Sequence, residues 1–227
     1  MTAQEKLEKK KFYYSLIFPS LFVMVIWIVK LSEILLDTSF SRYGIFPLET
    51  DGLIGILTGP LIHGDLGHLM TNTLPLLILG VGLFYFYDTI ALKVFLIIYF
   101  LSGIMLWLGG REAYHIGASG VIYGLAAFHF FSGIIRKHPR LMALSLLVVF
   151  LYGGMIWGVL PLDAQTSWEG HLFGAMTGVA MSFYYKNRGP QRKKYDWEIE
   201  EEMEEMNMDY YDWQIYQHFK NKERKKH

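Results

Sequence analysis

Long apolar stretches, separated by brief polar interruptions, fill the chain between its two charged ends. Six of them are long enough to be helices that cross a membrane, whose apolar core takes about 20 residues of helix. These stretches are residues 13–29, 66–87, 91–108, 116–135, 141–160 and 168–185. Because lipid offers no hydrogen-bond partner to an open backbone, each stretch is predicted to be helical. The pattern therefore predicts an all-α membrane protein, folded as a bundle of six transmembrane helices.

The connection after the first stretch, residues 32–63, is long and contains two short apolar pieces, 43–48 and 53–57. Neither piece is long enough to span a membrane. Too many of the side chains are apolar for a simple exposed loop. We expect irregular structure that rests at the interface of the outer leaflet.

Lysine and arginine are unequally divided between the two sides that the six helices define. One side carries thirteen of them: Lys6, Lys9, Lys10, Lys11, Lys93, Arg136, Lys137, Arg140, Lys186, Arg188, Arg192, Lys193 and Lys194. The other side carries Arg42 and Arg111. Basic residues in short flanks favour the cytoplasmic side, so both termini are predicted to be cytoplasmic. The connections at 32–62, 109–115 and 161–167 then face outward.

Acidic and basic residues crowd the first eleven positions and the chain after residue 185. We divide the sequence into a basic cytoplasmic N-terminus (1–12), a membrane domain (13–186) and a charged cytoplasmic tail (187–227). In the tail, apolar residues recur at intervals of 4, 3, 4 and 3: Ile199, Met203, Met206, Tyr210 and Trp213. This stripe predicts an amphipathic helix that binds a cytoplasmic partner or the membrane surface. A largely disordered, solvated tail is the alternative.

The composition narrows the chemistry. The 227 residues include no cysteine, which excludes disulfides and cysteine-ligated metals. The net charge is zero, which gives no reason to expect nucleic acid as a partner. The histidine–glutamate pattern of zinc proteases is missing, because no glutamate stands between His63 and His68. We therefore predict neither a metal nor another cofactor.

Four strongly polar side chains lie inside the predicted helices, where such groups are costly and point to function. They are His68, Asn72, Ser119 and His171, near the outer ends of the second, fourth and sixth helices. His68 and Asn72 are four residues apart and share a helix face, as do Ser119 and Tyr123. Their common depth is what a single site requires.

Small residues give the fourth and sixth helices a reason to meet. Two rows repeat every four residues: Gly120 and Gly124 in the fourth helix, and Gly170, Gly174 and Gly178 in the sixth. Such rows let transmembrane helices approach closely, although ordinary packing explains either row alone. Close approach would bring Ser119 within hydrogen-bond distance of His171. Gly117 and Gly120 also leave room beside the serine for a backbone turn and a substrate.

These residues supply the parts of a serine hydrolase. Ser119 would be the nucleophile, and His171 the general base that takes its proton. The Ser119 backbone N–H and the side chains of His68 and Asn72 would stabilise an oxyanion.

An acidic third member is not evident. Glu169 faces nearly opposite to His171 on a helix, and Asp163 lies in an outer loop. We therefore predict a dyad, in which an aromatic ring, that of Tyr123, packs against the imidazole and orients it. The strand-borne G-x-S-x-G elbow of soluble hydrolases does not fit, because Val121 stands at its fifth position.

Three stretches then resemble the rhomboid family of intramembrane serine proteases. They are HGDLGHLMTN (63–72), GASGVIYG (117–124) and GHLFGAMTG (170–178), in the order that the family has them. The resemblance covers about residues 12–186 and implies a six-helix bundle of the rhomboid type. It implies a bacterial inner-membrane protease that cuts transmembrane substrate proteins near the outer ends of their helices, without metal or cofactor.

The resemblance gives the same roles to the dyad and to the oxyanion-hole residues, and it implies that Tyr123 packs against His171. His63 would be structural and would anchor the first loop. A Trp-Arg pair found in that loop of many bacterial members is missing, since Ser41 and Arg42 are the nearest match. How the loop is anchored therefore stays open.

Two other functions compete with proteolysis. A catalytically silent scaffold would bind client transmembrane helices without cutting them. Inactive relatives of the family lack the serine or the histidine, whereas this chain keeps both. A proton-coupled transporter would need acidic residues in the central parts of its helices, and the sequence has none there.

The remaining histidines are assigned no catalytic role. His115 is expected to shape the loop that precedes Ser119. His129 and His138 fall too far along their helix from the serine and are expected at the cytoplasmic interface.

Overall fold

The computed structural model describes residues 2–151, 157–162, 166–190 and 196–224. Its long helices are α1 (Ala3–Leu35), α3 (Leu66–Phe86), α4 (Ala91–Gly109), α5 (Ser119–Ile135), α6 (Pro139–Leu151) and α7 (Trp168–Tyr184). Two tail helices follow, α8 (Asp196–Met206) and α9 (Tyr210–Arg224). The described residues form no strand and only one isolated bridge, between Ile45 and His115. The all-α prediction is confirmed.

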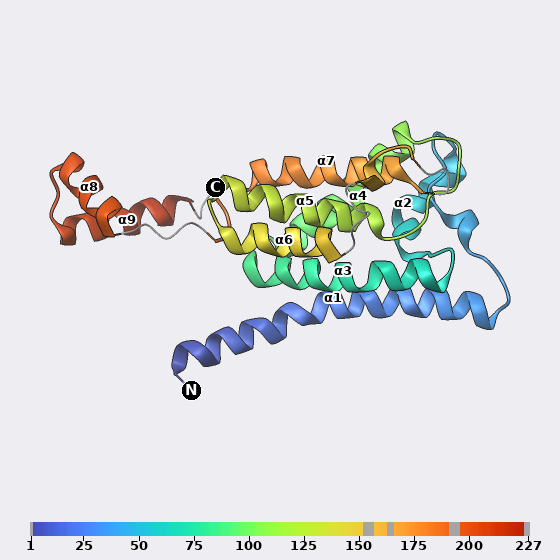
Figure 1. Ribbon diagram of the computed structural model, residues 1–227, viewed down its shortest axis with the longest axis horizontal. Helices are drawn as coiled ribbons and strands as arrows, with labels where there is room; N and C mark the ends of the chain where they lie inside the picture. Colours follow the sequence, from blue (N-terminus) through green and yellow to red (C-terminus); the bar gives the residue numbers. More distant parts are fainter. Residues whose placement is uncertain (1, 152–156, 163–165, 191–195, 225–227) are drawn as a thin grey trace.

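Helix α5 is the centre of the bundle and contacts α3, α4, α6 and α7, the last most extensively. Helix α1 packs along α3 at the edge of the bundle (Figure 1). Fully buried residues of three helices, among them Leu69, Leu79, Ile98, Leu125 and Phe128, form the core around α5. In lipid such helices are held by close packing and hydrogen bonds, because the surroundings are as apolar as the core.

Three helices have the length and apolar character of a membrane span by themselves. The most apolar windows of α1, α3 and α4 have mean hydropathies of 2.1, 1.7 and 2.1. Helices α5 and α7 have 17 residues each, or about 25 Å, which is near the lower limit for a span. Exposed Leu21, Met24 and Ile28 give α1 an apolar outer surface. The protein is an integral membrane protein, and part of its predicted fifth span, residues 152–156, lies outside the described residues.

Helix α1 extends beyond the predicted stretch 13–29 at both ends. Its start is fixed by a capping box, in which the Thr2 hydroxyl accepts from the Glu5 N–H and the Glu5 carboxylate accepts from the Thr2 N–H. The lysines and glutamates that follow favour helix, so the basic segment continues the membrane helix.

The tail forms two helices, so the single amphipathic helix predicted from its apolar stripe is wrong. Asn207 lies between α8 and α9 with φ of 51°, a left-handed conformation that ends a helix. The Trp213 indole N–H donates to the Glu202 carboxylate over 2.9 Å, and the Gln217 amide donates to the same group. These bonds join the two tail helices through Glu202.

The long first connection is built from short helical turns beside α4. They are η1 (Ser41–Tyr43), η2 (Thr50–Ile54), α2 (Gly55–Thr58) and η3 (Gly59–Leu61). Helix α2 contacts α4, and the Ile45 backbone pairs with that of His115 in both directions. The segment that we expected to be irregular is thus ordered and packed on the bundle.

A buried ion pair near the end of α1 anchors this first loop. The Lys30 ammonium lies 3.1 Å from Glu33 and donates to the carbonyl oxygens of His63 (3.0 Å) and Gly64 (2.9 Å). The other carboxylate oxygen of Glu33 accepts the Phe40 N–H. Both charged residues are buried, at 9% and 4% exposure. They connect α1 to the start of the loop and to the turn that precedes α3.

We expected His129 at the cytoplasmic interface from its depth, but it lies inside the bundle. It is fully buried, and its Nε2–H donates to the Leu79 carbonyl over 3.0 Å. Helix rise gives depth along the membrane but not the direction of the side chain, which here is toward α3. His138 is half-buried at the start of α6.

Replacing Lys30 tests the anchor. Lys30→Met should lower the free energy of unfolding by about 3 kcal/mol, because it leaves the buried Glu33 carboxylate without its cation. Adding Glu33→Leu should restore much of the loss. Denaturation in detergent, followed by tryptophan fluorescence, measures both. The exposed Lys93→Met is the matched control and should change stability by less than about 0.5 kcal/mol. Equal effects of the two lysine substitutions would contradict the anchor.

Candidate active site

The contact between α5 and α7 positions the candidate residues. A methyl group added at Gly174 would collide with the carbonyl oxygen of Gly120, and one at Gly178 would collide with that of Gly124. In the other direction, a methyl group at Gly120 would lie 3.1 Å from the Gly170 carbonyl oxygen. The two glycine rows therefore form one interface in which the main chains touch.

Ser119 and His171 face each other across this interface. Ser119 is the first residue of α5, and His171 lies in the first turn of α7. The His171 Nε2 is 2.8 Å from the Ser119 Oγ, which is hydrogen-bond distance. His171 is 8% exposed and Ser119 is partly exposed, so the pair is partly shielded from the surroundings.

A backbone carbonyl sets the tautomer of His171. Its Nδ1 lies 2.7 Å from the carbonyl oxygen of Gly158, which can only accept. The ring proton is therefore on Nδ1, and Nε2 is left to accept the Ser119 hydroxyl proton. Sequence reasoning missed Gly158, because a carbonyl partner has no residue type to reveal it.

Tyr123 lies one turn below Ser119 and packs against the imidazole. The ring centroids of Tyr123 and His171 are 4.1 Å apart, with an angle of 8° between the ring planes. A stack this flat restricts rotation of the imidazole and holds Nε2 toward the serine.

Side-chain donors from α3 approach the same place. A methyl group built on Gly117 would lie 2.7 Å from Nε2 of His68 and 3.6 Å from Nδ2 of Asn72. Gly117 has φ of +105°, which L-residues rarely adopt, so only glycine fits both the turn and the crowding. Among the described residues, the buried Asn72 amide nitrogen has no hydrogen-bond partner. The Ser119 N–H has no acceptor within α5, because it belongs to the first turn.

The other candidates lie outside the contact between serine and histidine. His63 is fully buried, its ring packs at 5.0 Å from that of His68, and its carbonyl binds Lys30. Burial lowers the pKa of His63 to about 4, so it is neutral at physiological pH. Glu169 pairs with Arg111 at 3.7 Å. Asp163 lies outside the described residues.

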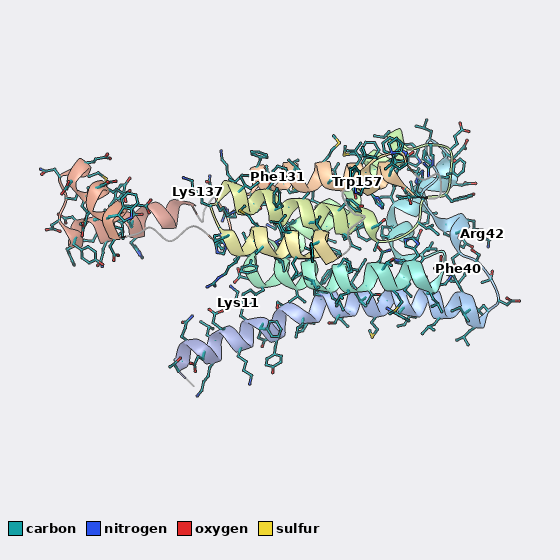
Figure 2. The ribbon with its side chains drawn as sticks, in the orientation of Figure 1. Lys11, Phe40, Arg42, Phe131, Lys137 and Trp157 are labelled. Carbon is teal, nitrogen blue, oxygen red and sulfur yellow. The ribbon has the colours of Figure 1, made fainter. Side chains whose placement is uncertain are left out.

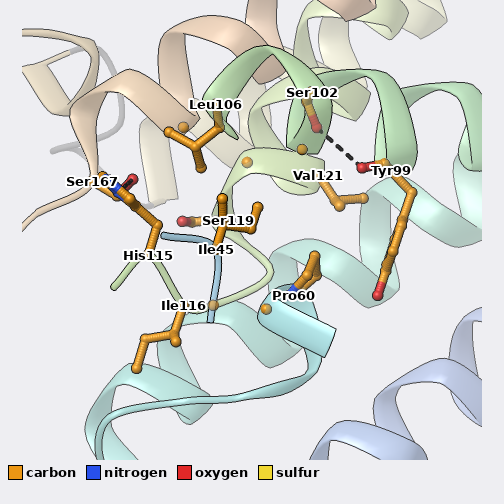
Figure 3. A pocket seen from close by; sticks show the side chains of 15 residues that line it. Ile45, Pro60, Tyr99, Ser102, Leu106, His115, Ile116, Ser119, Val121 and Ser167 are labelled. Atoms are coloured by element: carbon orange, nitrogen blue, oxygen red, sulfur yellow. Dashed lines mark hydrogen bonds between the residues drawn. The ribbon is translucent and has the colours of Figure 1, made fainter. Parts of the chain in front are cut away.

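A small cavity lies beside the serine. Ser119 borders it together with Ile45, Pro60, His115 and Ser167, as Figure 3 shows. Its volume is about 30 Å³, which is room for one or two water molecules. The described residues contain no group of three or more histidine or acidic side chains placed to hold a metal.

The site lies at one end of the bundle. Phe40 and Arg42 mark this end in Figure 2, whereas Lys11 and Lys137 lie toward the other. Ser119 and His171 belong to the first turns of their helices, so the pair is close to the loops rather than at mid-bundle.

These features define a membrane-embedded helical bundle with a hydrogen-bonded serine and histidine near one end. The Rhomboid domain model matches residues 50–188, and the chain belongs to the rhomboid family. Uncharacterized protein Rv1337 of Mycobacterium tuberculosis and Mb1372 of Mycobacterium bovis are each 38% identical over 186 residues, 76% of this chain and 75% of theirs. ML1171 of Mycobacterium leprae, also described as an uncharacterized protein, is 34% identical over 76% of this chain and 71% of its own.

The glycine interface can be tested by adding one methyl group. Gly174→Ala should lower stability by about 2 kcal/mol, because the new side chain pushes α7 away from α5. Thermal unfolding in detergent measures the change. Gly64→Ala is the matched control, since its methyl group meets nothing closer than 4.0 Å. A Gly174→Ala protein as stable as the control would contradict the close contact.

Proposed function

We propose that the protein is an intramembrane serine endopeptidase that uses Ser119 as nucleophile and His171 as general base. The observation that carries the proposal is the 2.8 Å contact between Ser119 Oγ and His171 Nε2, with the ring proton fixed on Nδ1. Membership of the rhomboid family supports it, because rhomboid domains are generally proteases, although some are inactive.

Acylation follows from this geometry. The Ser119 oxygen attacks the carbonyl carbon of the scissile peptide as its proton moves to His171 Nε2. The carbonyl electron pair moves onto oxygen and forms a tetrahedral oxyanion. When the carbon–nitrogen bond breaks, His171 donates that proton to the leaving amine, which leaves the acyl group on Ser119.

Oxyanion stabilisation falls to the donors around Gly117. The Ser119 N–H, His68 and the Asn72 amide approach this point from α5 and α3. A buried amide without a partner is costly, and a developing negative charge would satisfy it. Donors that are already in place need no reorganisation during the reaction.

Deacylation needs water in an apolar environment. The cavity beside Ser119 is large enough to hold it close to the acyl group. Water attacks the acyl carbon while His171 takes its proton, and the proton then returns to the serine oxygen. The reaction involves no change of oxidation state, and the protein and water supply every reacting group. We therefore propose no cofactor.

The substrates are transmembrane segments of other proteins. The site lies near one end of the bundle, so it would reach the end of a substrate helix rather than its middle. A peptide carbonyl within a helix is hydrogen-bonded, so the segment must unwind locally before attack. The lysines at the opposite end support a cytoplasmic location for both termini. The mycobacterial relatives support a bacterial plasma membrane as the location.

Cleavage of a reporter transmembrane protein in liposomes tests the proposal. Wild type should cleave it, whereas Ser119→Ala and His171→Ala should lower the rate by at least about 10³-fold. The matched control is Ser182→Ala, whose hydroxyl donates to the Val179 carbonyl within its own helix. A wild-type protein that binds the reporter but cleaves no faster than Ser119→Ala would be a scaffold, contrary to the proposal.

Asn72→Leu separates catalysis from stability. It removes a donor from the oxyanion hole and should lower kcat by about 10²-fold. Because the amide has no partner among the described residues, stability should be unchanged or higher. Reporter cleavage and thermal unfolding are measured on the same preparation. Unchanged kcat, or loss of activity that follows loss of folded protein, would refute the role of Asn72.

A further inference from the structure

A second polar contact joins the segments that carry the dyad. His115 lies in the loop before α5, and Ser167 is the residue just before α7. The His115 Nδ1 is 2.6 Å from the Ser167 hydroxyl, and its Nε2 is 3.1 Å from the Arg111 carbonyl oxygen. His115 is 4% exposed and Ser167 is partly exposed, so this contact is partly buried. Both side chains border the cavity beside Ser119 (Figure 3).

The donors in this contact can be assigned. The Arg111 carbonyl only accepts, so the His115 proton is on Nε2. Nδ1 therefore accepts the proton of the Ser167 hydroxyl. Burial lowers the pKa of His115, which keeps the imidazole neutral and this arrangement intact at physiological pH.

The two contacts have matching positions along the chain. His115 precedes Ser119 by four residues, and Ser167 precedes His171 by four. The contacts of 2.6 Å and 2.8 Å are thus two parallel links between the same two segments. The glycine rows set how close α5 and α7 come, but smooth main-chain surfaces do little to stop one helix sliding along the other. The hydrogen bond between His115 and Ser167, four residues before the dyad on each segment, is directional and can prevent this sliding.

Each end of the second contact is held by its own backbone. The His115 N–H and carbonyl both pair with Ile45, at 2.8 Å and 3.0 Å. On the other side, the Ser167 carbonyl accepts the His171 N–H at 3.2 Å. A shift of Ser167 would therefore reach His171 directly, and a shift of His115 would have to break its pairing with Ile45.

An ion pair supports the same connection. Arg111 Nη1 lies 3.7 Å from the Glu169 carboxylate, and Arg111 Nη2 donates to the Thr166 carbonyl over 2.8 Å. Glu169 belongs to the first turn of α7, and Arg111 is the residue whose carbonyl holds His115.

We propose that His115 and Ser167 are positioning residues, which form a clasp that fixes Ser119 against His171 for proton transfer. Their side chains bond to each other and to the Arg111 carbonyl, and they act through the alignment of the two segments. This inference rests on the proposed protease function. Small errors of alignment matter, because a displacement of about 1 Å in an active site costs on the order of 10²-fold in rate.

The test compares Ser167→Ala, His115→Phe and the double variant in the liposome cleavage assay. Each single variant should lower kcat by about 10- to 100-fold with KM changed less than about twofold. The double variant should be no worse than the poorer single, because both changes break one bond. Ser167→Thr, which keeps the hydroxyl, should recover most of the rate. Tyr114→Phe, next to the clasp and half-exposed, is the control and should match wild type.

Several results would overturn the clasp: wild-type kcat in Ser167→Ala and His115→Phe, losses that multiply in the double variant, or a rise in KM with kcat unchanged. Thermal unfolding shows whether a variant has simply lost its fold. If Ser167→Ala or His115→Phe does not fold, Ser167→Thr becomes the test. A folded Ser167→Thr protein whose kcat stays low would contradict the inference.

A spectroscopic measurement separates this inference from the proposed function. The His171 Nδ1–H that binds Gly158 should give a downfield proton resonance, absent in a His171→Ala sample. Ser167→Ala should shift or broaden it, whether or not wild type cleaves a substrate. An inactive wild type would defeat the proposed function alone, whereas an unchanged resonance in Ser167→Ala would defeat the clasp.

Discussion

The main-chain contact between α5 and α7 is the constraint on which the rest of the structure depends. The axes of helices that carry ordinary side chains lie about 8–10 Å apart. At that separation a short serine side chain on one helix does not regularly come within hydrogen-bond distance of a histidine on the other. Here the glycines let carbonyl oxygens of one helix touch the Cα positions of the other. The hydroxyl of Ser119 and the imidazole of His171 meet as a consequence, without long flexible side chains.

The fold must also give its buried polar groups hydrogen-bond partners while it keeps the reactive groups available for a substrate. Lys30 and Glu33 satisfy each other and the ends of the first loop, and His171 Nδ1 is satisfied by a carbonyl. The Asn72 amide nitrogen has no hydrogen-bond partner among the described residues, and the same holds for several other buried side-chain atoms, both ring nitrogens of His63 among them. What distinguishes the Asn72 amide is its place beside Gly117, where the proposed reaction develops negative charge that a donor already in position can stabilise.

Much of this could be predicted from the sequence. Apolar length gave the six helices, and spacing placed Ser119 and His171 at one depth. What could not be predicted depends on direction or on main chain. His129 has the expected depth but turns inward, Asn207 breaks a stripe that looks continuous, and Gly158 acts through its carbonyl. The Lys30 anchor was missed because a lysine at a helix end usually reaches for water.

The central claim is that Ser119 and His171 react as one unit. A peptidyl chloromethyl ketone tests it, because its carbonyl takes a serine oxygen while its chloromethyl carbon alkylates an adjacent histidine. Digestion and mass spectrometry should find the inhibitor attached to His171 in wild type and no adduct in Ser119→Ala, because the serine oxygen must hold the ketone beside the imidazole for alkylation to occur. An inhibitor attached elsewhere, or a wild-type protein that remains unmodified, would contradict the joint reaction of the two residues.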